Sequence, residues 1–346
     1  MNIRIIKGFK KLFSNYLNYK LRRTRPTLCY YHITHRCNLS CRFCLNTQRE
    51  KLYFSHSPSN IFYKNTPFIK YLPPDNEMTT EQAKYAIDQL EKLGISIITF
   101  TGGEPLLRKD LEELAQYARK KGMKTHLFTN STLITEERVR FLKGCFDNIT
   151  VSIYGLGKLD DEIKQKEGSF QNIIRFLQLS KKYRGAIVGI RLVISKYNCH
   201  QIEDFLDFAK EYCDFAQFVP VELSSDEFFL NKESALIVEK KLLKLKEKNK
   251  DFIVNSIESF KLFREYLMGK IPPRKCIAYN FFLTLGPAGE FGACCYPFAI
   301  GNILTQDPKK LLKIGLSKKK ELQEKCRNMI CLVNPSLGDH FPNVFF

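Results

Sequence analysis

Six short apolar runs, separated by amphipathic segments, are the feature that most narrows the folds open to this chain. The runs are rich in Ile, Val, Phe, Tyr and Thr, and most are continuous, which is typical of parallel strands buried on both faces. Strands that alternate with helices predict an α/β fold, here a parallel (β/α)6 TIM-like barrel that is either closed or partial. The active site of such a barrel lies at the carboxyl ends of its strands. The expected strands cover residues 28–34, 96–101, 124–129, 148–153, 187–194 and 215–219.

Capping signals mark where the intervening helices begin. Thr79 and Gln82 have the spacing of a capping box, and Asp110 and Glu113 repeat that spacing before the next helix. Thr135 is expected to cap a third, shorter helix. Apolar residues at helical spacing predict further helices over 168–183, 201–212, 233–250 and 252–268.

Composition divides the chain into four predicted parts. They are a basic amphipathic helix at 1–26, the barrel at 27–225, a helical linker at 226–270 and a small C-terminal domain at 271–346. Residues 49–77 interrupt the barrel between its first strand and first helix, with mixed polarity and no periodicity. A loop of this length on the active-site side is a lid, a substrate-binding insertion or a plain surface excursion.

Twelve cysteines in 346 residues favour metal binding over a disulfide framework. The chain is not small and begins without a secretory signal, so we expect a cytoplasmic protein whose thiols stay reduced. Its apolar runs are far shorter than the roughly 20 residues of a membrane-spanning helix. Reduced cysteines are available as metal ligands, which makes their spacing informative.

Three of the cysteines, Cys37, Cys41 and Cys44, directly follow the first expected strand in the pattern CxxxCxxC. Three thiolates within eight residues can hold one inorganic centre. A closed zinc or cluster site uses four ligands, so one metal position would stay open to another ligand. The alternative is a structural zinc with His35 as its fourth ligand.

A second motif, Gly102-Gly103-Glu104-Pro105, stands at the end of the second expected strand. Two glycines at a strand tip let the backbone approach a ligand closely. The carbonyls and the carboxylate of this segment suit an ammonium group.

Both motifs within one six-stranded pattern resemble the radical S-adenosylmethionine (radical SAM) superfamily, over about residues 27–225. The resemblance implies that Cys37, Cys41 and Cys44 bind a 4Fe–4S cluster. The fourth iron of that cluster would take the methionyl amine and carboxylate of S-adenosylmethionine. The resemblance also implies which residues contact that cofactor. Gly102, Gly103 and Glu104 would receive the methionyl amine, and Arg191 would pair with the carboxylate. Ser152 would contact the ribose or carboxylate, Phe43 would lie beside the adenine, and Asn130 would face the same rim.

The C-terminal part holds further cysteines around GPAGEFGAC, a segment that predicts a hairpin. It resembles the SPASM or shortened twitch extension of radical SAM enzymes. That resemblance implies one auxiliary 4Fe–4S cluster bound by Cys276, Cys294, Cys326 and Cys331, with Cys295 as the alternative to Cys294. A zinc site or scattered buried thiols are the other interpretations. Small buried hydrophobic side chains are expected at Cys29, Cys145, Cys199 and Cys213.

The charge of the chain is strongly basic, with 55 Lys and Arg against 36 Asp and Glu, a formal net charge of +19. Residues 1–26 hold eight basic and no acidic residues, with apolar residues at three- and four-residue steps. Such a helix lies on an anionic membrane or docks its apolar face against the barrel, so a peripheral membrane contact stays open. Basic residues elsewhere lack interleaved aromatic residues, and we therefore expect no nucleic acid partner.

The resemblance implies an enzyme that receives an electron from an external donor of the flavodoxin or ferredoxin type. The resulting 5′-deoxyadenosyl radical would take a hydrogen atom from a substrate, most commonly a peptide or protein side chain in members with such an extension. Residues 155–167 lack the histidine and glycines that many peptide-modifying members carry, and a membrane lipid or isoprenoid is the alternative substrate. A zinc-stabilised binding module without catalysis is the alternative of a different class. No catalytic residue is named by the sequence.

Overall fold

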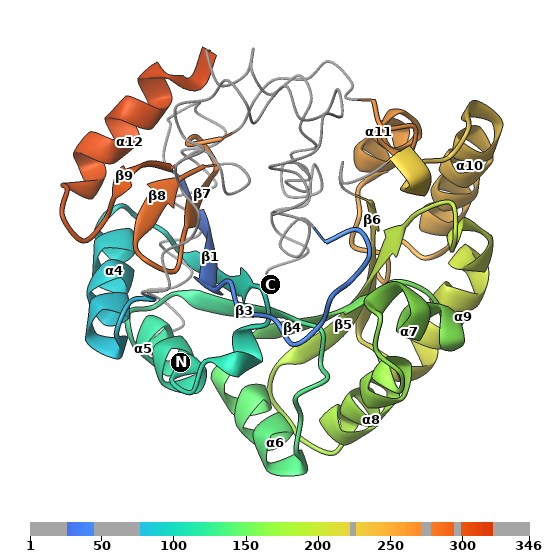
Figure 1. The fold of residues 1–346 in the computed structure, drawn as a ribbon, viewed down its shortest axis with the longest axis horizontal. Helices are drawn as coiled ribbons and strands as arrows, with labels where there is room; N and C mark the ends of the chain where they lie inside the picture. The colour runs from blue at the N-terminus through green and yellow to red at the C-terminus, as the bar shows by residue number, and fades with distance from the viewer. Residues whose placement is uncertain (1–25, 45–76, 222–225, 271–277, 294–298, 321–346) are drawn as a thin grey trace.

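The computed structural model describes residues 26–44, 77–221, 226–270, 278–293 and 299–320. All six expected strands are present and pair in parallel, in the order in which they occur along the chain (Figure 1). Their bounds lie within one residue of those expected. They are β1 Leu28–Thr34, β2 Ile97–Gly102, β3 Lys124–Thr129, β4 Asn148–Ile153, β5 Ile187–Ile194 and β6 Phe215–Pro220.

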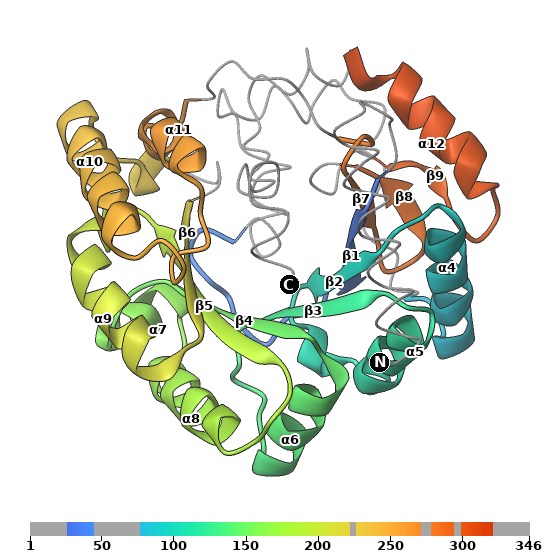
Figure 2. The same cartoon turned by 180° about the vertical axis from the view of Figure 1, so that it is seen from behind.

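The sheet continues past β1 into the C-terminal part of the chain. Strand β7 (Phe282–Leu285) pairs in parallel with β1, and β8 (Glu290–Gly292) and β9 (Ala299–Asn302) follow in antiparallel pairing. The hairpin expected at GPAGEFGAC is confirmed as β7–β8. The described C-terminal strands therefore extend the barrel sheet beyond its expected edge (Figure 2). The division of the chain into domains stays a prediction.

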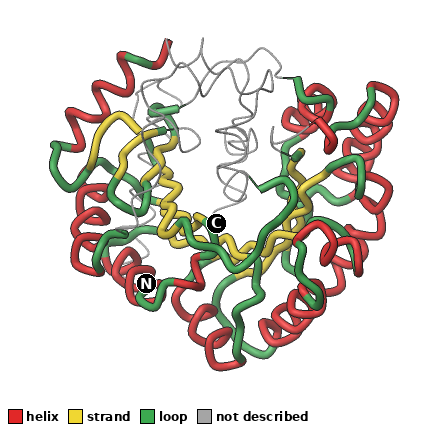
Figure 3. Tube along the Cα trace, viewed as in Figure 1, coloured by secondary structure: helices red, strands yellow, loops and turns green. Residues whose placement is uncertain are grey.

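Helices form the outer layer around the convex face of the curved sheet (Figure 3). Fully buried side chains that point outward from the strands, such as Tyr31, Phe100, Leu127 and Ile190, make the core beneath them. The described helices are α4 Thr80–Lys92, α5 Leu111–Lys120, α6 Glu136–Cys145, α7 Lys158–Lys164, α8 Ser169–Lys181, α9 Ile202–Tyr212, α10 Lys232–Lys248, α11 Ile257–Leu267 and α12 Pro308–Ser317.

Two of the three expected helix caps are confirmed with their capping hydrogen bonds. Thr79 and Gln82 form a reciprocal capping box at α4, and the Thr135 side chain accepts from the N–H of Arg138 at α6. Asp110 is the N-cap residue of α5, as expected, but the expected capping box does not form. Its carboxylate makes no capping hydrogen bond, because it accepts from Arg108 instead, at 2.6 and 2.8 Å. A nearby guanidinium satisfies that carboxylate better than an orphan backbone N–H does.

The helix expected over 252–268 begins later than its apolar spacing indicates. Ser256 is the N-cap of α11, and its side chain accepts from the N–H of Ser259 at 3.1 Å. The residues before it include Ile253, whose bridge to Ala216 adds a parallel contact at the edge of β6. Pairing with the sheet edge thus replaces the first expected helical turn.

The buried histidine of β3, His126, gives the fold a testable pH dependence. Burial lowers the pKa of His126 from 6.5 to about 4. Because the folded protein resists protonation of His126, the free energy of unfolding is highest above pH 6.5. It decreases as the pH falls towards 4, where the unfolded chain binds the proton and the folded chain does not. In the His126→Gln variant, we expect the decrease in the free energy of unfolding over this pH range to be smaller than in wild type, by up to about 3 kcal/mol. Urea unfolding across that range measures it, and the exposed His200→Gln should follow the wild-type curve. Equal pH slopes for wild type and His126→Gln would contradict the assignment.

Candidate functional site

The cysteine loop, residues 35–44, follows the carboxyl end of β1 and contains a turn at its last cysteines. The N–H of Cys44 donates to the carbonyl of Cys41 at 3.0 Å, which closes the turn. Cys41 is buried, while Cys37 and Cys44 are half-buried. None of the described cysteines forms a disulfide. The three thiols expected as ligands therefore share one short loop at the active-site end of the barrel.

Burial controls the protonation of two of these thiols. It raises the pKa of Cys37 and raises that of Cys41 to about 12. These two thiols therefore hold their protons near neutral pH. Binding of a metal centre would displace those protons, since the thiolate is the ligand.

The end of β2 runs directly along the cysteine loop. The N–H of Gly103 donates to the carbonyl of Thr34 at 2.8 Å, and the N–H of Glu104 donates to the carbonyl of Arg36 at 2.9 Å. A Cβ atom added at Gly102 would lie 2.1 Å from the oxygen of Thr34, and one at Gly103 would lie 2.2 Å from that of Arg36. Gly102 also has a φ of 137°. The two glycines thus allow the backbone after β2 to lie directly against the backbone of the cysteine loop. This structural role is separate from any contact with a ligand.

Glu104 is fully buried and links the loops that follow β2 and β3. Its carboxylate accepts from the N–H of Leu106 at 3.0 Å, the hydroxyl of Thr129 at 2.7 Å and the N–H of Asn130 at 2.7 Å. Burial raises its pKa against the effect of these three donors. The described donors to the Glu104 carboxylate are all groups of this chain. A contact between this carboxylate and a methionyl amine therefore stays a prediction.

We expect Glu104→Gln to destabilise the protein by about 1–3 kcal/mol. Both carboxylate oxygens accept hydrogen bonds from backbone N–H groups. In the glutamine variant the NH2 group replaces one of these oxygens, so two hydrogen-bond donors would point at each other. Urea unfolding of the metal-free protein measures the loss. The exposed Glu167→Gln is the matched control and should stay within about 0.5 kcal/mol of wild type. Equal stability of the two variants would show that the Glu104 carboxylate does not hold these loops together.

Asn130 reaches the cysteine loop through a small amide network. Its Nδ2 donates to Oδ1 of Asn38 at 3.0 Å and lies 4.0 Å from the sulfur of Cys37. Its Oδ1 accepts from the N–H and the hydroxyl of Thr132, and that hydroxyl accepts from Asn38 at 2.7 Å. The described contacts of Asn130 fix the first part of the cysteine loop, and its place in the cofactor site stays a prediction.

Phe43 packs into a small apolar cluster rather than into open space. Its ring meets Tyr154 edge-on, with centroids 4.6 Å apart, and Phe228 at 5.5 Å. Val221 and Ile163 complete the buried part of this cluster. The cluster joins the cysteine loop to the carboxyl end of the barrel after β4 and β6. Contact between Phe43 and an adenine stays a prediction.

Arg191 lies on the concave face of the sheet, a point that alternation alone leaves open. Its guanidinium carbon is 3.9 Å from the ring centroid of Phe128, and its Nε donates to Gln217 at 2.7 Å. This contact with β3 crosses β4 on the face opposite the helices. Ser152 is in register with Arg191, which in turn is in register with Gln217. The concave face thus presents a hydroxyl, a cation and an amide at one level.

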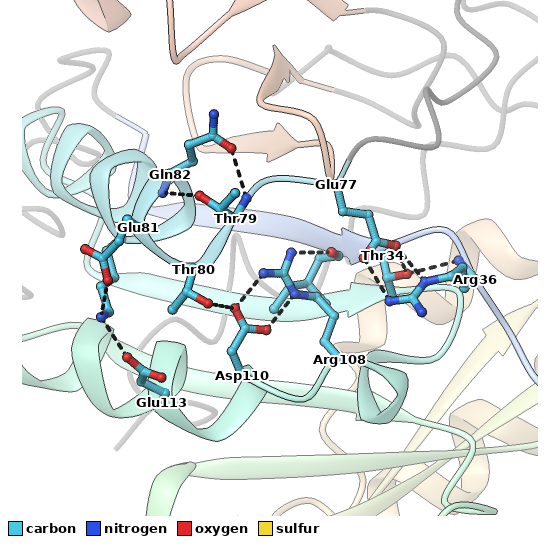
Figure 4. A network of polar contacts seen from close by, with 12 residues as sticks. Thr34, Arg36, Glu77, Thr79, Thr80, Glu81, Gln82, Arg108, Asp110 and Glu113 are labelled. Carbon is cyan, nitrogen blue, oxygen red and sulfur yellow. Dashed lines mark hydrogen bonds and ion pairs between the residues drawn. The ribbon is translucent and has the colours of Figure 1, made fainter.

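Charged side chains hold the end of β1 and the start of α4 together (Figure 4). Glu77 pairs with Arg36 at 2.9 Å and accepts from the hydroxyl of Thr34. Arg108 pairs with Asp110 and donates to the carbonyl of Ile33 at 3.2 Å. This network ties Glu77, the last residue of the predicted insertion, to the start of the cysteine loop.

The remaining predicted metal ligands lie outside the described residues. In the part of the chain that the structure describes, no three His, Cys, Asp or Glu side chains are grouped as around a single metal ion. A 4Fe–4S cluster binds its cysteines through different irons, so its ligands need not converge on one point. The predicted ligands left undescribed are Cys276, Cys294, Cys326 and Cys331, with the alternative Cys295.

The cysteines without an expected ligand role behave in two ways. Cys29 and Cys145 are buried, as expected, whereas Cys199 and Cys213 are only half-buried.

Across the described ranges, no helix is both long and apolar enough to span a membrane.

Several residues near the site escape the sequence analysis. A glutamine inside an apolar run could have indicated Gln217, and the spacing of four between Asp160 and Lys164 could have indicated an ion pair. Neither pattern reveals burial. Asn38 and Thr132 carry no sequence signal, because the amide network joins residues from two separate loops.

Comparison with known proteins agrees with this geometry. A family model described as the Radical SAM superfamily matches residues 31–209. The chain is 33% identical over 210 residues to Fe-coproporphyrin III synthase of Methanosarcina barkeri, covering 60% of this chain and 47% of that protein. It is 26% identical over 188 residues to PqqA peptide cyclase of Bradyrhizobium diazoefficiens, covering 53% and 43%. The chain therefore spans about half the length of these curated relatives.

Solved structures show the same fold at low sequence identity. Streptococcus suis SuiB bound to S-adenosylmethionine aligns with a TM-score of 0.60 at 17% identity, covering 86% of this chain and 66% of SuiB. The protein anSMEcpe with bound AdoMet aligns with a TM-score of 0.59 at 20% identity, covering 83% and 80%.

Proposed function

Because this chain belongs to the radical SAM superfamily, we propose that it cleaves S-adenosylmethionine reductively at a 4Fe–4S cluster held by Cys37, Cys41 and Cys44. With one electron from a flavodoxin- or ferredoxin-type donor, the cofactor held by these residues would supply methionine and a 5′-deoxyadenosyl radical through cleavage of the S–C5′ bond. That radical would take a hydrogen atom from the substrate. Membership of a family of enzymes also decides against a zinc-stabilised module without catalysis.

The observation that carries this proposal is the meeting of four loops at the carboxyl ends of β1 to β4. The cysteine loop contacts the glycines after β2, the Asn130 turn after β3 and helix α7 after β4. A three-thiol set suits a cluster with one iron left for a further ligand. Arg191 and Gln217 add a cation and an amide on the concave face, which suit the carboxylate of a methionyl group. The residues present thus fit the cofactor.

Anaerobic purification and reconstitution test this function. We expect roughly eight irons per chain with matching sulfide if both clusters form. Reduction in the presence of S-adenosylmethionine should release 5′-deoxyadenosine. Zinc in place of iron, or no nucleoside product from an iron-loaded protein, would refute the proposal.

For the substrate we propose a peptide or protein side chain. A relative named as a peptide cyclase supports this class, and SuiB and anSMEcpe, which share the fold, were solved with peptides bound. A tetrapyrrole is the second candidate, since relatives include Fe-coproporphyrin III synthase and AdoMet-dependent heme synthase. Tyr30 and Phe128, with ring centroids 6.4 Å apart, could face either class beside Arg191. The class that stimulates 5′-deoxyadenosine formation, peptide library or Fe-coproporphyrin, decides between them.

We further propose one auxiliary 4Fe–4S cluster at Cys276, Cys294, Cys326 and Cys331. The basis is their spacing and their resemblance to the twitch extension. Changing Cys326 to Ala should remove about half of the iron and spare the first cluster. Full iron content in this variant would contradict the ligand set.

A peripheral membrane contact through residues 1–26 is the remaining alternative, and it would favour a lipid or isoprenoid substrate. Its basis is the basic amphipathic pattern of that segment. Flotation with anionic liposomes, with and without residues 1–26, tests it. Binding lost on truncation supports the contact, and no binding of either form refutes it.

A further inference from the structure

The side-chain amide of Asn130 is held in one orientation by groups at both of its ends. Its Oδ1 accepts from the N–H of Thr132 at 2.9 Å and from the Thr132 hydroxyl at 2.7 Å. Its Nδ2 donates to Oδ1 of Asn38 at 3.0 Å. The reversed amide would place its NH2 group against the Thr132 N–H and its oxygen against the Asn38 oxygen. The network therefore determines which end of this buried amide faces the cysteine loop.

The backbone around Asn130 is fixed as well. The N–H of Asn130 donates to the buried carboxylate of Glu104 at 2.7 Å, and the N–H of Ser131 donates to the hydroxyl of Thr129 at 2.9 Å. Ser131 has a φ of 57°, in the left-handed region that residues other than glycine seldom adopt. Such a conformation costs of order 1–3 kcal/mol and persists only where the surroundings hold it, often at functional sites. The turn after β3 thus holds Asn130 against the cysteine loop despite a strained neighbour.

One N–H of this amide faces a predicted cluster ligand. An asparagine Nδ2 carries two hydrogens, and the bond to Asn38 uses one of them. The sulfur of Cys37 lies 4.0 Å from the same Nδ2. A neutral thiol is only a weak acceptor, which accords with this long separation. A thiolate, the form in which cysteine binds metal, attracts an N–H more strongly, since hydrogen bonds to charged groups are about twice as strong.

Joining the neighbouring loops does not by itself require this amide. Asn38 donates to the hydroxyl of Thr132 at 2.7 Å, which already connects the cysteine loop to the turn after β3. The N–H groups of Gly103 and Glu104 connect the cysteine loop to the end of β2. What the Asn130 side chain adds to these links is a fixed N–H beside the Cys37 sulfur.

From this geometry, and resting on the proposed function, we propose that Asn130 is a positioning residue that donates a hydrogen bond to the Cys37 thiolate. Through that bond it raises the reduction potential of the cluster at Cys37, Cys41 and Cys44. Reduction adds one electron from the external donor, and with it one negative charge that is shared by the ligand sulfurs. A hydrogen bond to a ligand sulfur therefore stabilises the reduced state more than the oxidised state.

The first test is an EPR-monitored redox titration of the full-length, anaerobically reconstituted protein. It follows the reduced-cluster signal that changes when S-adenosylmethionine is added, which separates this cluster from an auxiliary one. Asn130→Ala removes the side-chain N–H but keeps the backbone bond to Glu104, so the midpoint should become more negative. We expect roughly a tenfold change in the one-electron reduction equilibrium, which corresponds to about 59 mV.

Thr132→Val is the matched control. It removes the hydroxyl that bonds both Asn38 and Asn130, but it leaves Nδ2 of Asn130 and its bond to Asn38. The N–H of residue 132 still holds Oδ1 of Asn130, so the midpoint should equal that of wild type. An equal negative shift in Thr132→Val and Asn130→Ala would overturn the inference, because general loosening of the two loops would then explain both.

Asn130→Ala could fail to fold, so a second measurement uses the wild-type protein. With nitrogen-15 in the asparagine side chains, pulsed EPR of the reduced cluster should detect a hyperfine coupling to an amide nitrogen. Absence of this coupling would overturn the inference. Its persistence in a folded, cluster-loaded Asn130→Ala variant would do the same, because the coupled nitrogen would then belong to another residue.

A wild-type midpoint in cluster-loaded Asn130→Ala would also contradict the role assigned to this amide. Loss of the cluster from an Asn130→Ala protein that still folds would overturn it as well, because the amide would then serve assembly rather than potential. A wild-type protein that binds no iron–sulfur cluster would instead refute the proposed function itself.

Discussion

The Cys41→Ala variant is expected to form no detectable 5′-deoxyadenosine and to lose the iron of the first cluster. Cys41 is the most deeply buried thiol of the loop, between two half-buried ones, and its neighbour Arg42 is fixed to α7 by a backbone hydrogen bond. Two remaining thiols cannot hold a cluster that needs three protein ligands. Iron analysis and nucleoside chromatography of the anaerobic protein measure both losses.

Cys199→Ala is the matched control for this variant. Cys199 is half-buried in the short 3₁₀ helix Cys199–Gln201, outside the CxxxCxxC segment, and should retain wild-type iron and activity. Unchanged nucleoside formation by Cys41→Ala would contradict the assignment of the triad. Equal loss in both variants would show that the assay reports general damage rather than a lost ligand.

Gly103→Ala is expected to lower S-adenosylmethionine cleavage by about 100-fold, although the substitution adds only one methyl group. The new Cβ would lie 2.2 Å from the carbonyl oxygen of Arg36, so the loop after β2 and the cysteine loop must move apart. A displacement of about 1 Å in the positioning of reacting groups costs a factor of this order. Initial rates of 5′-deoxyadenosine formation at saturating S-adenosylmethionine measure the effect.

Gly144→Ala separates this clash from the general effect of adding a methyl group. Gly144 lies in α6, and a Cβ atom added there meets no atom within 4 Å. Alanine in a helix should be neutral or slightly stabilising. Wild-type activity of Gly103→Ala would show that close approach of the two loops is not needed for cleavage.

Local sequence signals predicted most of the barrel. The strands β1, β3, β4 and β5 have the expected bounds, because continuous apolar runs between turns define parallel strands without reference to distant residues. The cysteine loop was also predictable, since its three thiols are neighbours in sequence.

Features that depend on distant partners could not be predicted. The pairing of β7 with β1 joins residues about 250 positions apart, and a hairpin motif does not specify which sheet edge it meets. Asp110 is the N-cap residue of α5, as expected, but its carboxylate pairs with Arg108 and the expected capping box does not form. The concave orientation of Arg191 became evident only from its contact with Phe128.

The site shows the same division between local and distant information. Sequence placed Asn130 on the active-site rim, but not its bond to Asn38. The spacing of Asp160 and Lys164 fits a solvent-exposed helical pair as well as a buried one. Only packing against the cysteine loop distinguishes the two, and packing is not encoded in the spacing.

The most direct test of the three-thiol cluster is the EPR spectrum of the reduced protein with and without S-adenosylmethionine. A cluster held by Cys37, Cys41 and Cys44 leaves one iron open, so addition of S-adenosylmethionine should change the g values of the reduced cluster. The Cys41→Ala variant should lack that responsive signal. A spectrum that is identical with and without S-adenosylmethionine, in a wild-type protein with full iron content, would contradict the account.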